Sequence, residues 1–202
     1  ILCRTTVDVS PVFFAQRIKG RIQNAFREAG DRADFSRKLA VRTLGDNTRE
    51  TVVSYVRRQA ARSHYVDPRY KAYLDRLVVV DPNVRLDVPA ATARGRYWYN
   101  LHVVVVVSDR RYPVTRKEVF SRLREICIRT AAETGHGLAR LALMPDHIHM
   151  ALRGDVEQSP AQIGLTFLNE LAHAVGMTRF WSGEYYVGTF SEYAASKIRP
   201  SP

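Results

Sequence analysis

The chain has 202 residues, 46% of them hydrophobic, so it can bury one large core or two small ones. Its 31 Lys and Arg against 20 Asp and Glu give a net charge of +11 at pH 7, which favours a polyanionic partner such as nucleic acid over an acidic small molecule. The longest uninterrupted apolar run, residues 103–107, is too short to span a bilayer, so a soluble cytoplasmic protein is expected. The two cysteines have no paired spacing, which argues against a disulfide framework or a cysteine zinc site.

The first predicted helix begins at a Ser-Pro pair at residues 10 and 11 and runs to about residue 30, followed by a short strand over 36–43. The same order recurs near the C-terminus, with a Ser-Pro helix over 159–176 and a strand over 182–189. Pro160 lies 149 residues after Pro11, and Ser182 lies 146 residues after Ser36. The pattern therefore predicts an internal repeat in which one loop differs by three residues.

A second helix is predicted over residues 47–64, with Asn47 as its N-cap and Glu50 three residues later. Tyr55 and Gln59 are four residues apart on this helix and therefore share a face. The glutamine is a neutral oxygen ligand for a metal ion, and a tyrosine can form a covalent intermediate. Taken alone, a tyrosine at such a position is more often an ordinary, partly buried residue.

Residues 65–95 are expected to form a linker with one short helix. The rest of the chain is predicted to form a strand at 96–108, a helix at 115–135, a strand at 137–143, a strand from His147, and the helix and strand of the repeat. The Met-Pro-Asp turn at 144–146 makes its flanking strands antiparallel. This order predicts a ferredoxin-like α+β fold with an antiparallel sheet and helices packed on one face.

The stretch "MPDHIHMALRG" at 144–154 places His147 and His149 on one face of a strand and Ile148 on the other. Two imidazoles can bind one metal ion, but a third ligand must come from elsewhere in the fold, and Gln59 is a candidate. Without further context, such a pair is also consistent with structural histidines or a chance zinc site.

The stretch "LMPDHIHMAL" resembles the His-hydrophobic-His strand of the HUH single-tyrosine transposases, above all the REP-associated tyrosine transposases. In that family the usual form is Met-Pro-Asn-His-hydrophobic-His, so Asp146 departs from the pattern. The stretch "YVRRQ" at 55–59 resembles the family's nucleophile helix, in which a Gln follows the Tyr four residues later. The resemblance covers most of the chain outside residues 65–95.

The resemblance implies a metal-dependent reaction that cleaves and rejoins single-stranded or hairpin DNA through a 5′-phosphotyrosine on Tyr55. It assigns His147, His149 and Gln59 as ligands of Mg²⁺ or Mn²⁺. In dimers of the family, the Tyr helix of one protomer can complete the His site of the other. Residues 1–64 would then be the C-terminal half of a first HUH-like unit, and residues 96–202 would be a second unit. The active site would be assembled either within one pseudo-dimeric chain or between the two chains of a homodimer. Because the chain begins with Ile, it is expected to be a fragment that lacks the first unit's His strand.

Basic side chains are expected to form the surface that contacts the DNA backbone. They are Arg17, Lys19, Arg21, Arg37, Lys38, Arg57, Arg58, Arg62, Arg110 and Arg111. An alternative function is a catalytically inactive, domesticated module that binds hairpin DNA without cutting it. An RNA-binding ferredoxin-like domain is disfavoured, since the strands carry no aromatic run of the kind that stacks on RNA bases.

Overall fold

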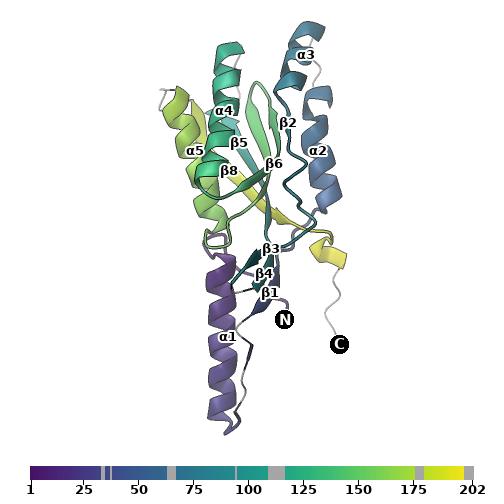
Figure 1. Cartoon of the computed structure of the whole chain (residues 1–202). Coiled ribbons are helices and arrows are strands. Elements are labelled where there is room, and N and C mark those ends of the chain that lie inside the picture. Colours follow the sequence, from purple (N-terminus) through teal and green to yellow (C-terminus); the bar gives the residue numbers. More distant parts are fainter. Residues whose placement is uncertain are drawn as a thin grey trace.

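A five-stranded antiparallel sheet forms the centre of the fold in the computed structural model of the chain (Figure 1). Its strands, in spatial order, are β2 (Val79–Val80), β6 (Gly137–Leu143), β7 (His147–Arg153), β5 (Asn100–Val107) and β8 (Trp181–Phe190). The structure describes residues 1–32, 35–36, 38–62, 67–93, 95–108, 117–175 and 180–197, without the side chains of residues 60–62. No helix within these ranges is long and apolar enough to cross a membrane. The predicted α+β architecture with an antiparallel sheet is confirmed.

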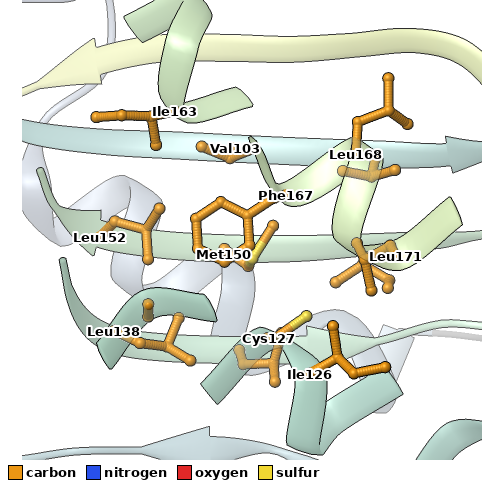
Figure 2. Packing of buried hydrophobic residues seen from close by; sticks show 14 of the residues in the cluster. Val103, Ile126, Cys127, Leu138, Met150, Leu152, Ile163, Phe167, Leu168 and Leu171 are labelled. Atoms are coloured by element: carbon orange, nitrogen blue, oxygen red, sulfur yellow. The ribbon is translucent and has the colours of Figure 1, made fainter. Parts of the chain in front are cut away.

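Two helices, α4 (Lys117–Glu133) and α5 (Pro160–Val175), cover one face of this sheet and enclose the main core (Figure 2). Strand alternation sends Val103 and Met150 into this core, where Phe167 of α5 packs against the same cluster. The start of α5 is held by a capping box, because the Gln162 N–H donates to Ser159 Oγ and the Ser159 N–H donates to Gln162 Oε1. The Ser-Pro pattern thus sets where this helix begins.

Truncation of Phe167 to Ala is expected to lower the free energy of unfolding by about 3–5 kcal/mol, because the ring is fully buried and its loss leaves a cavity. Urea denaturation followed by circular dichroism measures this change. Leu165→Ala is the matched control, since that side chain lies on the same helix but is 45% exposed. Its substitution should change stability by no more than about 0.5 kcal/mol. Equal losses in the two variants would contradict the assignment of the core.

The helix α2 (Arg49–Arg62) lies on the opposite face of the sheet, against β6 and β7. The prediction that the helices pack on one face is therefore wrong for this element. Val52 and Val56, one turn apart on α2, form its apolar stripe. They pack in a second, smaller cluster with small sheet residues, Ala142 and Ala151 among them, which let the helix approach closely.

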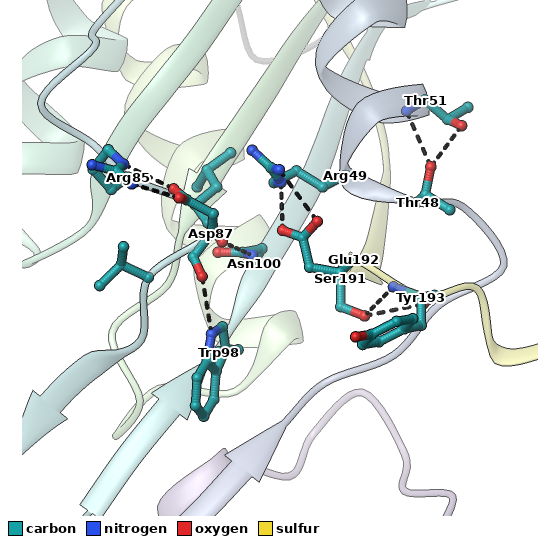
Figure 3. Close-up of polar contacts among 12 residues, drawn as sticks. Thr48, Arg49, Thr51, Arg85, Asp87, Trp98, Asn100, Ser191, Glu192 and Tyr193 are labelled. Atoms are coloured by element: carbon teal, nitrogen blue, oxygen red, sulfur yellow. Dashed lines mark hydrogen bonds and ion pairs between the residues drawn. The ribbon is translucent and has the colours of Figure 1, made fainter. Parts of the chain in front are cut away.

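The N-terminus of α2 is fastened to the segment that follows β8 (Figure 3). Thr48 is the residue that caps the helix, since the Thr51 N–H donates to Thr48 Oγ1 at 3.3 Å, and the expectation of Asn47 as the cap is wrong. Arg49 forms an ion pair with Glu192 at 2.6 Å, and its backbone N–H donates to the Ser191 carbonyl oxygen. These contacts fix the position of α2 relative to β8.

The N-terminal helix α1 (Pro11–Glu28) extends from one end of the molecule beside a second, three-stranded sheet (Figure 1). That sheet consists of β1 (Leu39–Arg42), β4 (Gly95–Trp98) and β3 (Ala90–Thr92), in the order β1-β4-β3. The strand predicted over 96–108 is therefore divided between two sheets. The division falls at Tyr99, whose buried ring packs in the main core and whose hydroxyl donates to the Gln158 carbonyl oxygen.

The segment predicted as a linker contains the expected short helix, α3 (Pro68–Leu77), and also supplies β2 and β3. Leu74 of α3 is fully buried in the main core. Further along, the Trp98 indole N–H donates to the Asp87 carbonyl oxygen, and the Asn100 amide donates to the Leu86 carbonyl oxygen (Figure 3). Described residues of this segment are therefore packed against the sheet. A short 3₁₀ helix, η2 (Ala195–Lys197), follows the last strand.

Candidate active site

The two motif histidines lie on the face of β7 that α2 covers. Their strand pairs with β5, where His147 is opposite Val106 and His149 is opposite Val104. Ile148, between them, is buried in the main core on the other face. The two imidazole rings are 4.6 Å apart between centroids and nearly perpendicular. The His-x-His spacing therefore places both rings side by side on one surface, as strand geometry requires.

His147 is oriented by its neighbour Asp146. Its Nδ1 is 2.6 Å from Asp146 Oδ1, and both side chains are partly exposed. An ionised carboxylate only accepts hydrogen bonds, so Nδ1 carries the proton in this contact. Nε2 is then the nitrogen through which His147 would bind a metal ion.

His149 is buried, with 4% of its surface exposed, and contacts a third histidine that was not among the predicted site residues. His102 on β5 has its Nε2 at 3.1 Å from His149 Nδ1, and the two rings are stacked with centroids 5.3 Å apart. Burial lowers the pKa of His102 to about 4, so this imidazole is neutral at pH 7 and one of its nitrogens can accept a hydrogen bond. Leu101 and Val103 point into the main core, so His102 between them points to the opposite face of the sheet, where the motif histidines lie.

The helix α2 brings Tyr55 to these histidines. The Tyr55 ring lies 5.2 Å from that of His149 and 6.0 Å from that of His102, and both contacts are edge to face. Gln59, one turn further along, is 8% exposed. Val52 and Val56 set the rotation of the helix, and Tyr55 joins their cluster as a partly buried member. Residues almost a hundred positions apart in the sequence thus meet across one face of the sheet.

The donor atoms at this site suit a divalent cation that accepts nitrogen and oxygen ligands. Two imidazoles stand side by side with their Nδ1 atoms held by neighbours. Over the described part of the chain, no three His, Cys, Asp or Glu side chains are grouped so that they could hold a metal ion. A third protein ligand would therefore have to be of another type, and the Gln59 amide oxygen on the facing helix meets that requirement.

The ten basic residues expected to contact DNA do not gather on one element. Arg17, Lys19 and Arg21 lie on α1, and Lys38 lies just before β1. The Arg17 guanidinium stacks on the Phe13 ring, and Lys19 Nζ donates to the Ser36 carbonyl oxygen. The predictions for Arg37, Arg110, Arg111 and the side chain of Arg62 fall outside the described residues and side chains.

Two exposed arginines, Arg57 and Arg58, are on the same helix as Tyr55. On β6, burial and then the positive charge of Arg57 lower the pKa of the Arg140 guanidinium. Sequence reasoning did not include Arg140, although a lone arginine inside the otherwise apolar strand 137–143 was a usable signal. The helix that carries Tyr55 therefore also carries two exposed positive charges.

Comparison with protein families matches residues 96–200 to the family described as "Transposase IS200 like". This span contains the three histidines and excludes Tyr55 and Gln59. Among solved structures, a proposed transposase from Deinococcus radiodurans R1 has a TM-score of 0.43 and 19% identity, with 48% of this chain and 84% of that chain covered. A REP-associated tyrosine transposase bound to a REP hairpin has a TM-score of 0.39 and 14% identity, with 51% of this chain and 58% of that chain covered. Comparison with curated proteins gives no match.

Proposed function

The chain belongs to the family of IS200-like transposases, whose pattern covers more than half of its residues, and on this premise we propose that it cleaves and rejoins single-stranded or hairpin DNA. The observation that carries the proposal is the contact between Tyr55 and His149, with ring centroids 5.2 Å apart. A tyrosine, a glutamine and a histidine pair from distant segments converge on one face of the sheet. A purely structural tyrosine on α2 would not require this set of partners.

In the proposed step, the Tyr55 hydroxyl oxygen attacks a DNA phosphorus and loses its proton to water. The new bond joins phosphorus to the tyrosine oxygen, the bond from phosphorus to the 3′ oxygen breaks, and that oxygen takes up a proton. The 5′ end of the DNA remains on the protein as a phosphotyrosine, which a 3′ hydroxyl can attack in reverse to rejoin the strand. No other reactant is needed, since one phosphodiester replaces another.

We assign His147, His149 and Gln59 as the residues that would hold Mg²⁺ or Mn²⁺. When bound, such an ion polarises the phosphate and stabilises the charge that develops on its oxygens. The chain's own contribution is orientation, because Asp146 holds the His147 ring and the α2 stripe holds Tyr55 over the histidines. Arg57 and Arg58, exposed on the same helix, would bind the flanking phosphates.

Two reciprocal pairs of hydrogen bonds support a pseudo-dimeric arrangement within the chain. The Val12 N–H donates to the Val156 carbonyl oxygen at 3.2 Å, and the Ala161 N–H donates to the Val7 carbonyl oxygen at 2.9 Å. Ala161 lies 149 residues after Val12 and Val156 lies 149 residues after Val7, the offset of the two Ser-Pro helices. The hydrogen bond from the first copy to the second is therefore equivalent to the bond from the second copy to the first, as expected of a two-fold interface.

The second pair joins the segments that follow the repeated strands. The Arg49 N–H donates to the Ser191 carbonyl oxygen, and the Ala195 N–H donates to the Gly45 carbonyl oxygen. Ala195 lies 146 residues after Arg49, and Ser191 lies 146 residues after Gly45, which is the offset that relates the two strands. Sequence similarity between two copies does not require that they contact each other through equivalent atoms. The reciprocal hydrogen bonds are therefore independent support for the tandem arrangement.

The helices of the two copies also present equivalent apolar stripes. Ile163, Phe167 and Leu171 of α5 are fully buried against the sheet. Their counterparts on α1, Phe14, Ile18 and Ile22, are half-buried and line a cavity of about 990 Å³ between α1 and β1. We therefore propose the division into related units at 1–64 and 96–202, joined by residues 65–95, with one active site assembled from both.

The binding part of the proposal is tested with fluorescent oligonucleotides. We expect the chain to bind hairpin and single-stranded DNA with an affinity that falls steeply as salt increases, because its basic side chains displace counterions from the phosphates. With Mn²⁺ it should cut these substrates, whereas intact duplex should be a poor substrate because its phosphates are not open to in-line attack. Titrations at several salt concentrations and denaturing gels measure the two effects.

Three results would count against the proposal. Affinity that does not change with salt would remove nucleic acid as the partner. Equal cutting of duplex and single strand would remove the preference for exposed phosphates. Tight, salt-dependent binding of hairpins without any cleavage would instead favour the domesticated binding module.

A further inference from the structure

We propose that His102 is a positioning residue, which accepts a hydrogen bond from His149 Nδ1 and thereby holds the His149 ring with Nε2 directed to the site. The inference deepens the proposed function and rests on it for its consequence, since it concerns how one assigned metal ligand is prepared. The described geometry around His102 carries it.

The contact is specific in both distance and orientation. His102 Nε2 is 3.1 Å from His149 Nδ1, within the range of a nitrogen–nitrogen hydrogen bond, and the ring planes differ by 18°. The two residues lie on adjacent strands, where His102 pairs with Ala151 and His149 pairs with Val104. They are therefore diagonal neighbours on one face, a relation in which long side chains reach each other.

The His102 ring is held in place on two further sides. The Tyr55 ring meets it edge to face with centroids 6.0 Å apart, and the Tyr186 ring does so at 5.7 Å. Over the described residues, His102 does not combine with the motif pair into a group of three side chains able to hold a metal ion. His102 is therefore placed to contact the metal ligand His149 and not to act as a third metal ligand itself.

One hydrogen lies between the two nitrogens, and its location decides which His149 nitrogen can bind a metal. If His149 donates through Nδ1, its Nε2 has a lone pair available for a cation. If His102 donates instead, His149 carries its hydrogen on Nε2 and that nitrogen cannot bind. The first arrangement matches His147, whose Nδ1 donates to Asp146, so both motif rings would present the same nitrogen.

Two substitutions separate this role from simple packing. His102→Phe keeps a ring of similar size and removes the acceptor, whereas His102→Gln places an amide oxygen near the position of Nε2. His173→Gln is the matched control, because that histidine is exposed on α5 and lies away from the site. Thermal melting of all variants verifies that each is folded.

The first measurement uses the ¹⁵N-labelled full chain without metal, in long-range ¹H–¹⁵N spectra that report the tautomer of each histidine. We expect His149 of the parent chain to carry its hydrogen on Nδ1, the Phe variant to lose this preference, and the Gln variant to retain it. The second measurement is Mn²⁺ binding followed by electron paramagnetic resonance. The dissociation constant should rise about 10- to 100-fold in the Phe variant, the usual effect of losing such a partner, and much less in the Gln variant.

An Nε2–H tautomer of His149 in the parent chain would overturn the inference. So would a Phe variant that matches the His173→Gln control in both measurements. If the parent chain binds no Mn²⁺ at all, the assigned metal site fails, while the metal-free spectra still decide whether His102 sets the tautomer. The two failures are therefore distinguishable.

Discussion

Tyr55→Phe is expected to abolish the covalent protein–DNA adduct while leaving DNA affinity and stability nearly unchanged. The substitution removes one hydroxyl and keeps the ring that packs against His149 and the α2 cluster. Without that oxygen, no bond to phosphorus can form. The adduct is measured as a slow-migrating band on a denaturing gel after incubation with labelled hairpin DNA and Mn²⁺.

Tyr186→Phe and Tyr193→Phe are the matched controls. The Tyr186 ring contacts that of His102 and is 52% exposed, and Tyr193 is 59% exposed, so each phenol is open to DNA. Both variants should form the adduct at the parent level. An adduct that survives in Tyr55→Phe and vanishes in either control would transfer the nucleophile to that residue.

His149→Ala is expected to lower the rate of metal-dependent cleavage by at least about 100-fold, because a polarising ion contributes several kcal/mol to such a reaction and each 1.36 kcal/mol is a factor of ten. DNA affinity should change little, since the basic side chains carry the binding. His147→Ala should act in the same way, and its partly exposed position makes a folding defect a weaker explanation. Cleavage rates on gels and affinity by fluorescence anisotropy measure the two effects separately.

Mixing Tyr55→Phe with His149→Ala tests whether the site is assembled within one chain. In the structure, α2 contacts the His strand of its own chain. Each variant chain in the mixture would therefore still have a defective site, and the mixture should remain inactive. Restored cleavage in the mixture would mean that α2 of one chain completes the His site of another, as in a homodimer. Loss of folding in the His149 variant, detected by circular dichroism, would support a structural role for that histidine.

Local sequence patterns determined which secondary-structure elements surround the site and on which face of each element the site residues lie. The one-residue spacing of His147 and His149 could place both rings on one face only, because strand side chains alternate. The Ser-Pro pairs located the starts of α1 and α5, since capping and proline preference act within a single turn. The four-residue spacing of Tyr55 and Gln59 likewise follows from helix geometry alone.

Only the tertiary structure decided which face α2 covers and which side chains meet there. A helix with a short apolar stripe can pack on any complementary surface, and the small residues Ala142 and Ala151 that receive Val52 and Val56 are distant in the sequence. His102 was not among the predicted site residues, because its contact with His149 depends on the register between β5 and β7 and not on its neighbours in the chain. The histidine strand and the tyrosine helix were visible in the sequence as separate features, whereas their contact depends on long-range packing that no local pattern encodes.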